Sequence, residues 1–230
     1  MKSIYIAVTA HDPLNRVETT LKVLKGYESI ELQKEIDIFI DYDHRLDVDE
    51  FSLIVASHTK LNRVGFVVAG EEYKGYDLCW AHKPSLIRKV SNRAHDFYMY
   101  SENDMLFTQK HFDYWHKYKD ELKTQNLEPG FCRFERLGHK LIPFDNHREW
   151  RLGGVTENVW GDIPFKSEFI PKPFEENIFG FTTLGNPYSG MMILDQEDAD
   201  KYIKSWSCNP IHSHPKTGKR NWPIADRASM

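Results

Sequence analysis

Two carboxylates stand one residue apart at the end of an apolar stretch in the middle of the chain. The four residues Phe97–Tyr100 are all large, and Glu102 and Asp104 follow them closely. Because alternate residues of an extended segment point to the same side, both carboxylates can face one cation. Oxygen ligands in such small number suit Mg²⁺ or Mn²⁺, with substrate phosphates completing the coordination. The alternative is an ordinary polar turn whose Glu and Asp side chains are solvated.

The elements that must position this pair alternate between strand and helix. Short β-rich runs predict strands, and apolar residues at helical spacing predict helices between them. The expected strands span residues 3–10, 35–44, 63–70 and 96–104, and the expected helices span residues 11–27, 49–59, 83–94 and 108–123.

Local signals refine these ranges. Asp12 can cap the first helix, Pro13 suits its first position, and Gly26 offers a stop. In the second strand, Ile36, Ile38 and Ile40 alternate on one face. Thr108 is expected to cap the helix that follows the acidic pair.

A strand–helix series of this kind predicts an α/β fold, with a central, mostly parallel sheet and helices on both faces. After residue 128 the pattern changes to short β-like pieces broken by Pro, Gly and Asn, followed by one helix over Gln196–Trp206. We therefore expect one domain over residues 1–230, with a nucleotide-binding half at 1–127 and a mixed, β-rich acceptor half at 128–230. In open α/β sheets, ligands bind beyond the carboxyl ends of the strands, where Glu102 and Asp104 are expected.

Composition narrows the function classes. The chain has 230 residues, 40% hydrophobic and 28% charged, which is typical of a globular protein. A formal charge of −4 without a basic block argues against a nucleic-acid partner. No apolar run reaches the roughly 20 residues of a membrane helix, so no transmembrane segment is expected. Three scattered cysteines do not form a disulfide framework, which favours a cytoplasmic location.

The order of these motifs resembles the GT-A class of nucleotide-sugar glycosyltransferases. In that class a fourth strand closes in a D-x-D motif, of which Glu102–Asp104 is an E-x-D variant. Tyr76–Lys89 is similar to the donor-binding segment before that motif. Asn186–Asp195 is similar to a later acceptor-side segment, in which a turn of small residues opens a strand.

This resemblance implies a donor site at the carboxyl edge of the sheet. Asp104, with Glu102 directly or through water, would hold Mn²⁺ or Mg²⁺ against the diphosphate of a nucleoside-diphosphate sugar. Asp41, with Asp43, would bind ribose hydroxyls or cap the turn after the second strand. Other residues fall where the nucleoside or the phosphates would lie; these are Thr9, Ala10, His11 and Arg16 for the nucleoside and Lys83 and Arg88 for the phosphates. For Lys83 and Arg88 the alternative is a solvated helix face.

The second half is expected to hold the acceptor, a saccharide or another hydroxyl compound. An inverting transferase needs a carboxylate as base. The candidates in this half are Asp145, Glu149, Asp162, Asp195 and Asp226, and no spacing rule selects among them; we expect the base at Asp195 or Asp226. Asp195 can instead cap the helix that starts at Gln196. His212 is a candidate for completing the metal coordination, as a late His does in some enzymes of this class; a plain polar loop is the alternative.

The sequence therefore predicts a metal-dependent transfer of a sugar from a nucleoside diphosphate to a hydroxyl group. Two alternatives stay open: a nucleotidyl- or phosphotransferase that uses the same carboxylates, and a carbohydrate-binding module without turnover. Neither the dinucleotide-binding G-x-G-x-x-G motif nor a P-loop occurs in the sequence.

Overall fold

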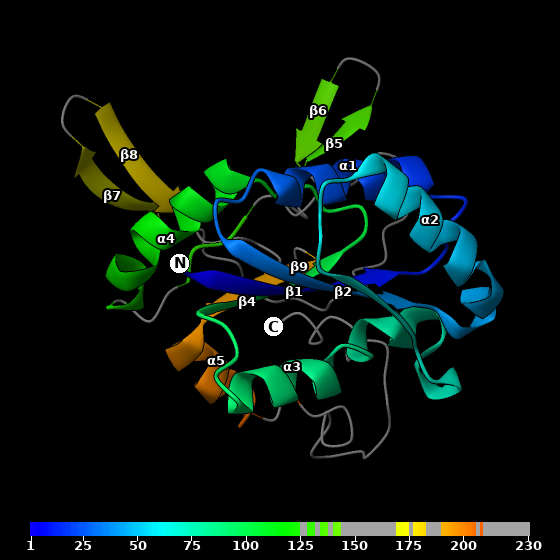
Figure 1. Cartoon of the computed structure of the whole chain (residues 1–230). Coiled ribbons are helices and arrows are strands. Elements are labelled where there is room, and N and C mark those ends of the chain that lie inside the picture. The colour runs from blue at the N-terminus through cyan, green and yellow to red at the C-terminus, as the bar shows by residue number, and fades with distance from the viewer. Residues whose placement is uncertain are drawn as a thin grey trace, which may run out of the picture.

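A computed structural model describes residues 1–124, 128–131, 134–137, 140–143, 169–174, 177–182, 190–205 and 208. Figure 1 shows a central sheet with helices on both of its faces. The strands of this sheet are β1 (Ser3–Ala10), β2 (Gln33–Ile40), β3 (Val64–Val68), β4 (Phe97–Glu102) and β9 (Met191–Asp195). Their order is β3-β2-β1-β4-β9, with β1 to β4 parallel and β9 antiparallel to β4. The predicted mostly parallel α/β sheet is confirmed.

The helices form a layer on each side of the sheet. Above it in Figure 1 lie α1 (Val17–Glu28), α2 (Val48–His58) and α4 (Gln109–Lys123), and below it lie α3 (Lys83–Ser91) and α5 (Gln196–Tyr202). Three short 3-10 helices lie between strands and helices: η1 (Tyr42–Asp47) follows β2, and η2 (Glu71–Tyr73) and η3 (Gly75–Trp80) follow β3. Two further antiparallel pairs are β5 (Phe134–Leu137) with β6 (Lys140–Pro143), and β7 (Phe169–Phe174) with β8 (Asn177–Thr182).

The strands have two apolar faces because both sides of a parallel sheet are covered. On the α1 side, Ile36, Ile38 and Ile40 share one face of β2 as predicted, and all three are fully buried in one cluster with residues of α1, α2 and α4. On the other side, Tyr98 and Tyr100 of β4 belong to a second cluster with residues of α3 and α5. Each helix layer thus has its own core.

Helix α1 differs from its prediction at both ends. It begins at Val17 and not at Pro13. Residues 13–16 form a turn, in which the Asp12 carboxylate accepts hydrogen bonds from the backbone and side chain of Asn15 at 3.4 and 2.9 Å. Gly26 does not end the helix, which continues to Glu28. A Cβ at Gly26 would lie 2.5 Å from the Phe107 carbonyl oxygen, so this glycine permits close contact with the chain after β4.

Helix α4 starts as predicted. Thr108 is its N-cap, and the His111 ring accepts the Thr108 backbone N–H at 3.0 Å. Among the described residues, no helix is long and apolar enough to cross a membrane. The division of the chain at residues 127 and 128 stays a prediction, as does the cytoplasmic location.

We predict that Gly26→Ala lowers the free energy of unfolding by about 1–3 kcal/mol, because the added methyl group overlaps the Phe107 carbonyl. Urea unfolding measures the change. Thr19→Ala, at an exposed position of the same helix, is the control and should leave stability within about 0.5 kcal/mol of the parent. Equal stability of Gly26→Ala and the parent would contradict the close contact.

Candidate nucleotide site at the carboxyl edge

The carboxyl ends of β1 and β4 meet at the point where the strand order reverses. Thr9 is in register with Glu102, and the Thr9 carbonyl accepts the Asn103 N–H at 3.0 Å. The Thr9 hydroxyl also lies 3.1 Å from the Tyr100 hydroxyl. Successive strands β2 and β3 extend the sheet to one side of β1, and β4 lies on the other side. A parallel sheet binds ligands at such a switch point, just beyond the strand ends.

The acidic pair does not lie on one extended segment. Strand β4 ends at Glu102, and a turn closes there with a hydrogen bond of 3.1 Å from the Met105 N–H to the Glu102 carbonyl. The buried Asn103 side chain donates to the Thr20 hydroxyl at 2.9 Å, which fixes the turn against α1. The alternation that was expected to align Glu102 with Asp104 therefore stops at Glu102.

The two carboxylates have neighbours on opposite faces of the sheet. Asp104 is exposed and lies 3.6 Å from Arg16, on the side of α1, where its charge also acts on Tyr27. Glu102 lies on the side of α3, where its charge raises the pKa of the Cys79 thiol in addition to the larger effect of burial. Arg16 and Asp104 are thus brought together as the predicted donor site requires.

Gly190 shapes the surroundings of Glu102. Its φ is +65°, and a Cβ there would lie 3.2 Å from a Glu102 carboxylate oxygen. The Gly190 carbonyl accepts the Glu102 N–H at 3.0 Å. The segment before β9, expected on the acceptor side, therefore reaches the acidic turn, and only a glycine fits there without moving Glu102.

Asp41 organises the neighbouring loops. Its side chain is fully buried and accepts hydrogen bonds from the N–H groups of Asp43 (3.0 Å) and Gly75 (2.7 Å), and it lies 2.7 Å from Nδ1 of His11. Burial alone would raise the pKa of Asp41, but these hydrogen bonds outweigh it and lower the pKa. Both oxygens are engaged, so the capping role is the observed one, and ribose binding by Asp41 is not supported.

The loop after β1 places His11 at the rim. Its side chain is 56% exposed although Nδ1 faces the buried Asp41. The His44 ring lies edge-on at a centroid distance of 6.0 Å, and its Nδ1 is 3.0 Å from Asp47. Sequence reasoning did not assign His44, because no motif spacing connects it with His11. Thr9 and Ala10 are buried, and Ala10 is part of the apolar core on the α1 side, so neither side chain is open to a nucleoside.

Lys83 and Arg88 do not act as a pair. Arg88 is exposed on α3, whereas Lys83 is only 2% exposed. Lys83 Nζ lies 4.4 Å from the Tyr202 ring centroid and 5.3 Å from that of Trp80. Burial lowers the pKa of Lys83 to about 7, with Cys208 and Cys79 partly offsetting the effect.

The predicted catalytic carboxylates are not brought to this edge. Asp195 pairs with Phe97 at the opposite end of β4, roughly 16 Å from Glu102 for five residues of strand. It accepts the Asp198 N–H at 3.0 Å as the N-cap of α5, and its other oxygen lies 2.7 Å from Lys119 Nζ. The capping alternative is therefore the observed one for Asp195. Asp226 and His212 lie outside the described residues.

The described residues contain no group of three or more His, Cys, Asp or Glu side chains that could hold a metal ion. Divalent magnesium can nevertheless be bound through one or two carboxylates plus substrate phosphates. The exposed Asp104 has the oxygen chemistry of such a ligand, and the Arg16 guanidinium lies 3.6 Å from it.

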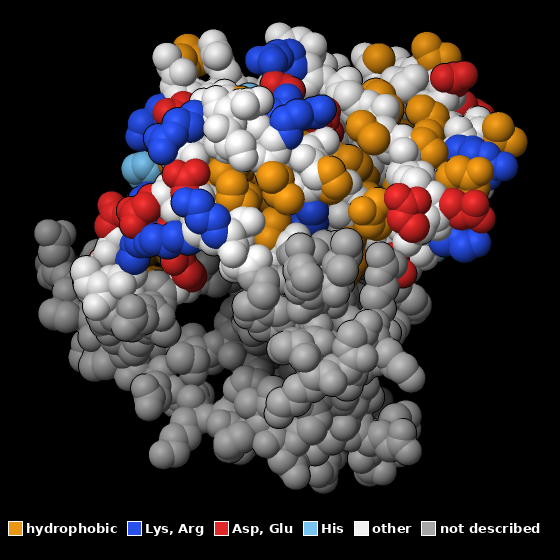
Figure 2. All heavy atoms as spheres, turned by 90° about the horizontal axis from the view of Figure 1, so that it is seen from below, with side chains coloured by type: hydrophobic (Ala, Val, Ile, Leu, Met, Phe, Trp, Pro, Cys, Tyr) orange, Lys and Arg blue, Asp and Glu red, His pale blue; other side chains and the backbone are white. Residues whose placement is uncertain are grey.

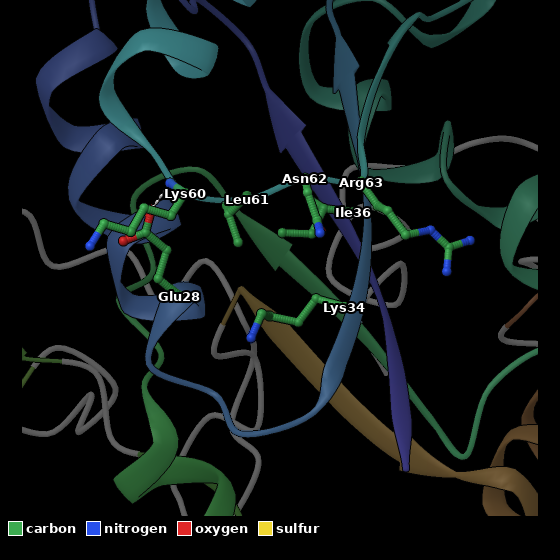
Figure 3. A pocket seen from close by; sticks show the side chains of 7 residues that line it. All are labelled: Glu28, Lys34, Ile36, Lys60, Leu61, Asn62 and Arg63. Carbon is green, nitrogen blue, oxygen red and sulfur yellow. Dashed lines mark hydrogen bonds between the residues drawn. The ribbon is translucent and has the colours of Figure 1, made fainter. Parts of the chain in front are cut away.

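A small pocket lies elsewhere and is not part of this site. Its volume is about 150 Å³, and it lies near the amino end of β2 and the chain that enters β3 (Figure 3). Four charged side chains are among the residues that line it, which are Glu28, Lys34, Ile36, Lys60, Leu61, Asn62 and Arg63. Arg63 is already paired with Glu35 at 2.7 Å.

The face below the sheet carries mixed charges. In Figure 2, Lys and Arg side chains alternate with Asp and Glu over the described residues, with apolar side chains between them. No extended block of positive charge is visible on that part of this face.

Comparisons with known proteins agree with the fold class. No protein-family model matches the sequence, and no curated protein sequence is similar to it. Among solved structures, the chain has neighbours with the nucleotide-binding, GT-A-like fold.

One of these neighbours is TarS 1-349 from S. aureus, at a TM-score of 0.50 and 11% identity. The match covers 99% of this chain and 53% of TarS 1-349, so the chain spans about half of that protein. Two structures of 4-diphosphocytidyl-2C-methyl-D-erythritol synthase, one from Anaerococcus prevotii, match at TM-scores of 0.41 and 0.42 with 10% and 9% identity. They cover 89% of this chain and 76% and 80% of their own. At these identities the likeness establishes the fold alone.

We predict that Gly190→Ala destabilises the protein more than Gly75→Ala does. Both glycines have positive φ, at +65° and +62°, and each alanine should cost about 1–2 kcal/mol of backbone strain. Only the alanine at position 190 also meets Glu102, because no atom lies within 4 Å of a Cβ at Gly75. Equal losses in urea unfolding would show that the contact with Glu102 has no cost.

We also predict that stability rises between pH 7 and pH 8.5 and that Lys83→Met removes this rise. The folded chain releases the Lys83 proton near pH 7, whereas the unfolded chain keeps it up to about 10.5. The unfolded state therefore binds more protons in this window, and raising the pH favours the folded state. Urea unfolding at several pH values measures the slope. A slope that survives in Lys83→Met would contradict the assignment.

Proposed function

We propose that this chain is a nucleotide-sugar glycosyltransferase that binds a nucleoside-diphosphate sugar at the carboxyl edge of its sheet. The observation that carries the proposal is the meeting of the β1 and β4 ends at the switch point, with Asp104, Arg16 and His11 around it. The GT-A-like fold shared with TarS supports it. A second structure of TarS 1-349 is a complex with UDP, which makes UDP the first nucleotide to test.

Each part of the donor has candidate contacts. The exposed His11 ring, oriented by the buried Asp41, lies at the end of β1 and can pack against or hydrogen-bond the nucleoside. The Arg16 guanidinium, 52% exposed and beside Asp104, can bind a phosphate oxygen. Because Asp104 already balances part of its charge, Arg16 alone does not neutralise a diphosphate.

A divalent ion, Mn²⁺ or Mg²⁺, would fit beside Asp104. Bound there with the diphosphate, it would stabilise the negative charge that develops on the leaving group. Glu102 would contribute only through water or by a change of side-chain conformation, since its neighbours lie on the other face of the sheet. We propose a site with one direct carboxylate ligand, Asp104.

The transfer itself breaks the bond between the anomeric carbon and the diphosphate oxygen, and the electron pair leaves with the nucleoside diphosphate. The acceptor hydroxyl oxygen forms the new bond to that carbon, and its proton passes to a base or to solvent. We do not assign this role to Asp195, because it pairs with Phe97 at the opposite end of β4. The acceptor, proposed to be a saccharide or another hydroxyl compound, would approach past Gly190 and Glu102.

We predict that UDP with Mn²⁺ raises the melting temperature of the parent protein and that Asp104→Asn abolishes the part of the rise that depends on Mn²⁺. A ligand at one hundred times its dissociation constant stabilises by about 2.7 kcal/mol. A thermal-shift panel of UDP, GDP, CTP and UDP-sugars, each with and without Mn²⁺, measures the effect.

Asp113→Asn, on the exposed side of α4, is the control and should respond like the parent. A response to CTP in preference to the diphosphates would instead support a nucleotidyltransferase. Stabilisation by free saccharide alone would support a binding module. An Asp104→Asn response equal to that of the parent would contradict the metal assignment.

A further inference from the structure

Strand β3 lies at one edge of the sheet, and in the described part of the chain only β2 pairs with it. Its five residues, VGFVV, include no charged residue and no proline, which are common means of keeping a further strand off an edge. Val67 and Val68 are 37% and 40% exposed. The outer side of β3 is therefore an apolar edge to which another strand can be added.

The hydrogen bonds to β2 show which backbone groups of β3 face outward. The Arg63 carbonyl accepts the Ile36 N–H at 2.9 Å, and the Ala69 N–H donates to the Ile40 carbonyl at 2.9 Å. In a parallel ladder, residues that bond one neighbour alternate with residues whose N–H and C=O groups point the other way. The outward-facing residues of β3 are therefore Val64, Phe66 and Val68.

This spacing suits a second copy of the same strand that runs antiparallel. With Phe66 opposite Phe66 of the second copy, Val64 lies opposite Val68 of the second copy. Each such pair exchanges two hydrogen bonds, about six in all, and any other register pairs fewer of the outward-facing residues. Gly65 then lies opposite the exposed Val67 of the second copy, where the missing side chain of the glycine leaves room for the valine.

The charges that flank β3 favour the antiparallel arrangement. Lys60 and Arg63 precede the strand, Glu71 and Glu72 follow it, and all four side chains are exposed. In the register centred on Phe66, Lys60 of each copy lies opposite Glu72 of the other, whereas a parallel pair would place like charges together. Complementary charges of this kind guide association and select its orientation.

We infer that two copies of this chain form a two-fold symmetric dimer, in which their β3 strands pair antiparallel and join the two five-stranded sheets. The inference does not depend on the proposed function, because β2 and β1 separate β3 from β4. Since the paired strands run in opposite directions, the carboxyl edges of the two copies lie on opposite sides of the joined sheet. Both candidate nucleotide sites thus stay open in the dimer.

The test is sedimentation velocity of the full chain at concentrations between about 1 and 100 µM, because a small interface of this kind is weak. We expect the mass to rise from 27.1 kDa toward twice that value. Val68→Pro removes an outward-facing N–H that β2 does not use, and it should weaken the dimer at least about tenfold. Val68→Thr keeps this N–H and should dimerise like the parent. Melting curves show whether both variants are folded.

A charge exchange tests the register and does not alter the strand itself. Lys60→Glu and Glu72→Lys each place like charges opposite one another, so each should weaken the dimer about fivefold at low salt. The double variant restores opposite charges and should recover the affinity of the parent. Lys110→Glu, at an exposed position of α4, is the control and should leave the affinity unchanged.

Three results would overturn the inference. They are a parent that stays monomeric throughout the concentration range, an assembly that grows beyond two copies, and a dimer that is unaffected by the charge reversals. If Val68→Pro does not fold, the charge exchange alone decides, because its substitutions lie outside β3.

Discussion

The parallel pairing of β1 with β4 is the constraint on which the candidate site depends. It brings the residues after Ala10 and those after Glu102 together although more than ninety positions separate them along the chain. The bond from the Asn103 N–H to the Thr9 carbonyl continues this pairing past the last strand residue, and the Asn103 side chain anchors the turn to α1. Asp41 then connects the loops after β1 and β2 through one buried carboxylate. The rigid strands thereby fix the positions of the polar loops that follow β1, β2 and β4.

Much of the fold is predictable from the sequence because each sheet strand carries its own signal. The alternation of Ile36, Ile38 and Ile40 and the cap at Thr108 are local patterns, and both are confirmed. The predictions that were wrong concern the two ends of α1, where a residue type that is typical of a helix end has a different role. Glycine is typical of a helix end, yet Gly26 lies inside α1, where it lets the Phe107 carbonyl approach the helix. Aspartate is typical of a helix N-cap, yet the Asp12 carboxylate accepts a hydrogen bond from Asn15 in a turn before α1. For Gly26, only the tertiary structure decides between such uses of one residue type.

The candidate site is less predictable, because its geometry depends on contacts between distant segments. The sequence identifies the edge and the acidic turn, but spacing alone cannot show that the chain bends after Glu102 and separates it from Asp104. Nor can it show that Lys83 faces inward while Arg88 faces outward, since both fit an amphipathic helix. Gly190 is informative in a different way: a small residue before a predicted strand indicates a close approach, but its partner, Glu102, is known only from the structure.

The antiparallel strand β9 has a consequence for how the protein is made. Its partner β4 leaves the ribosome long before it, because residues 103–190 must be synthesised in between. At ordinary translation speeds this delay lasts roughly 4–18 s. During this delay, the edge of β4 that later pairs with β9 has unpaired backbone N–H and C=O groups, next to the apolar side chains of Phe97 and Tyr98. An exposed strand edge of this kind can pair with another chain. Nascent copies on crowded ribosomes therefore pass through a period in which mispairing competes with completion of the sheet, and slower translation of this stretch would prolong it.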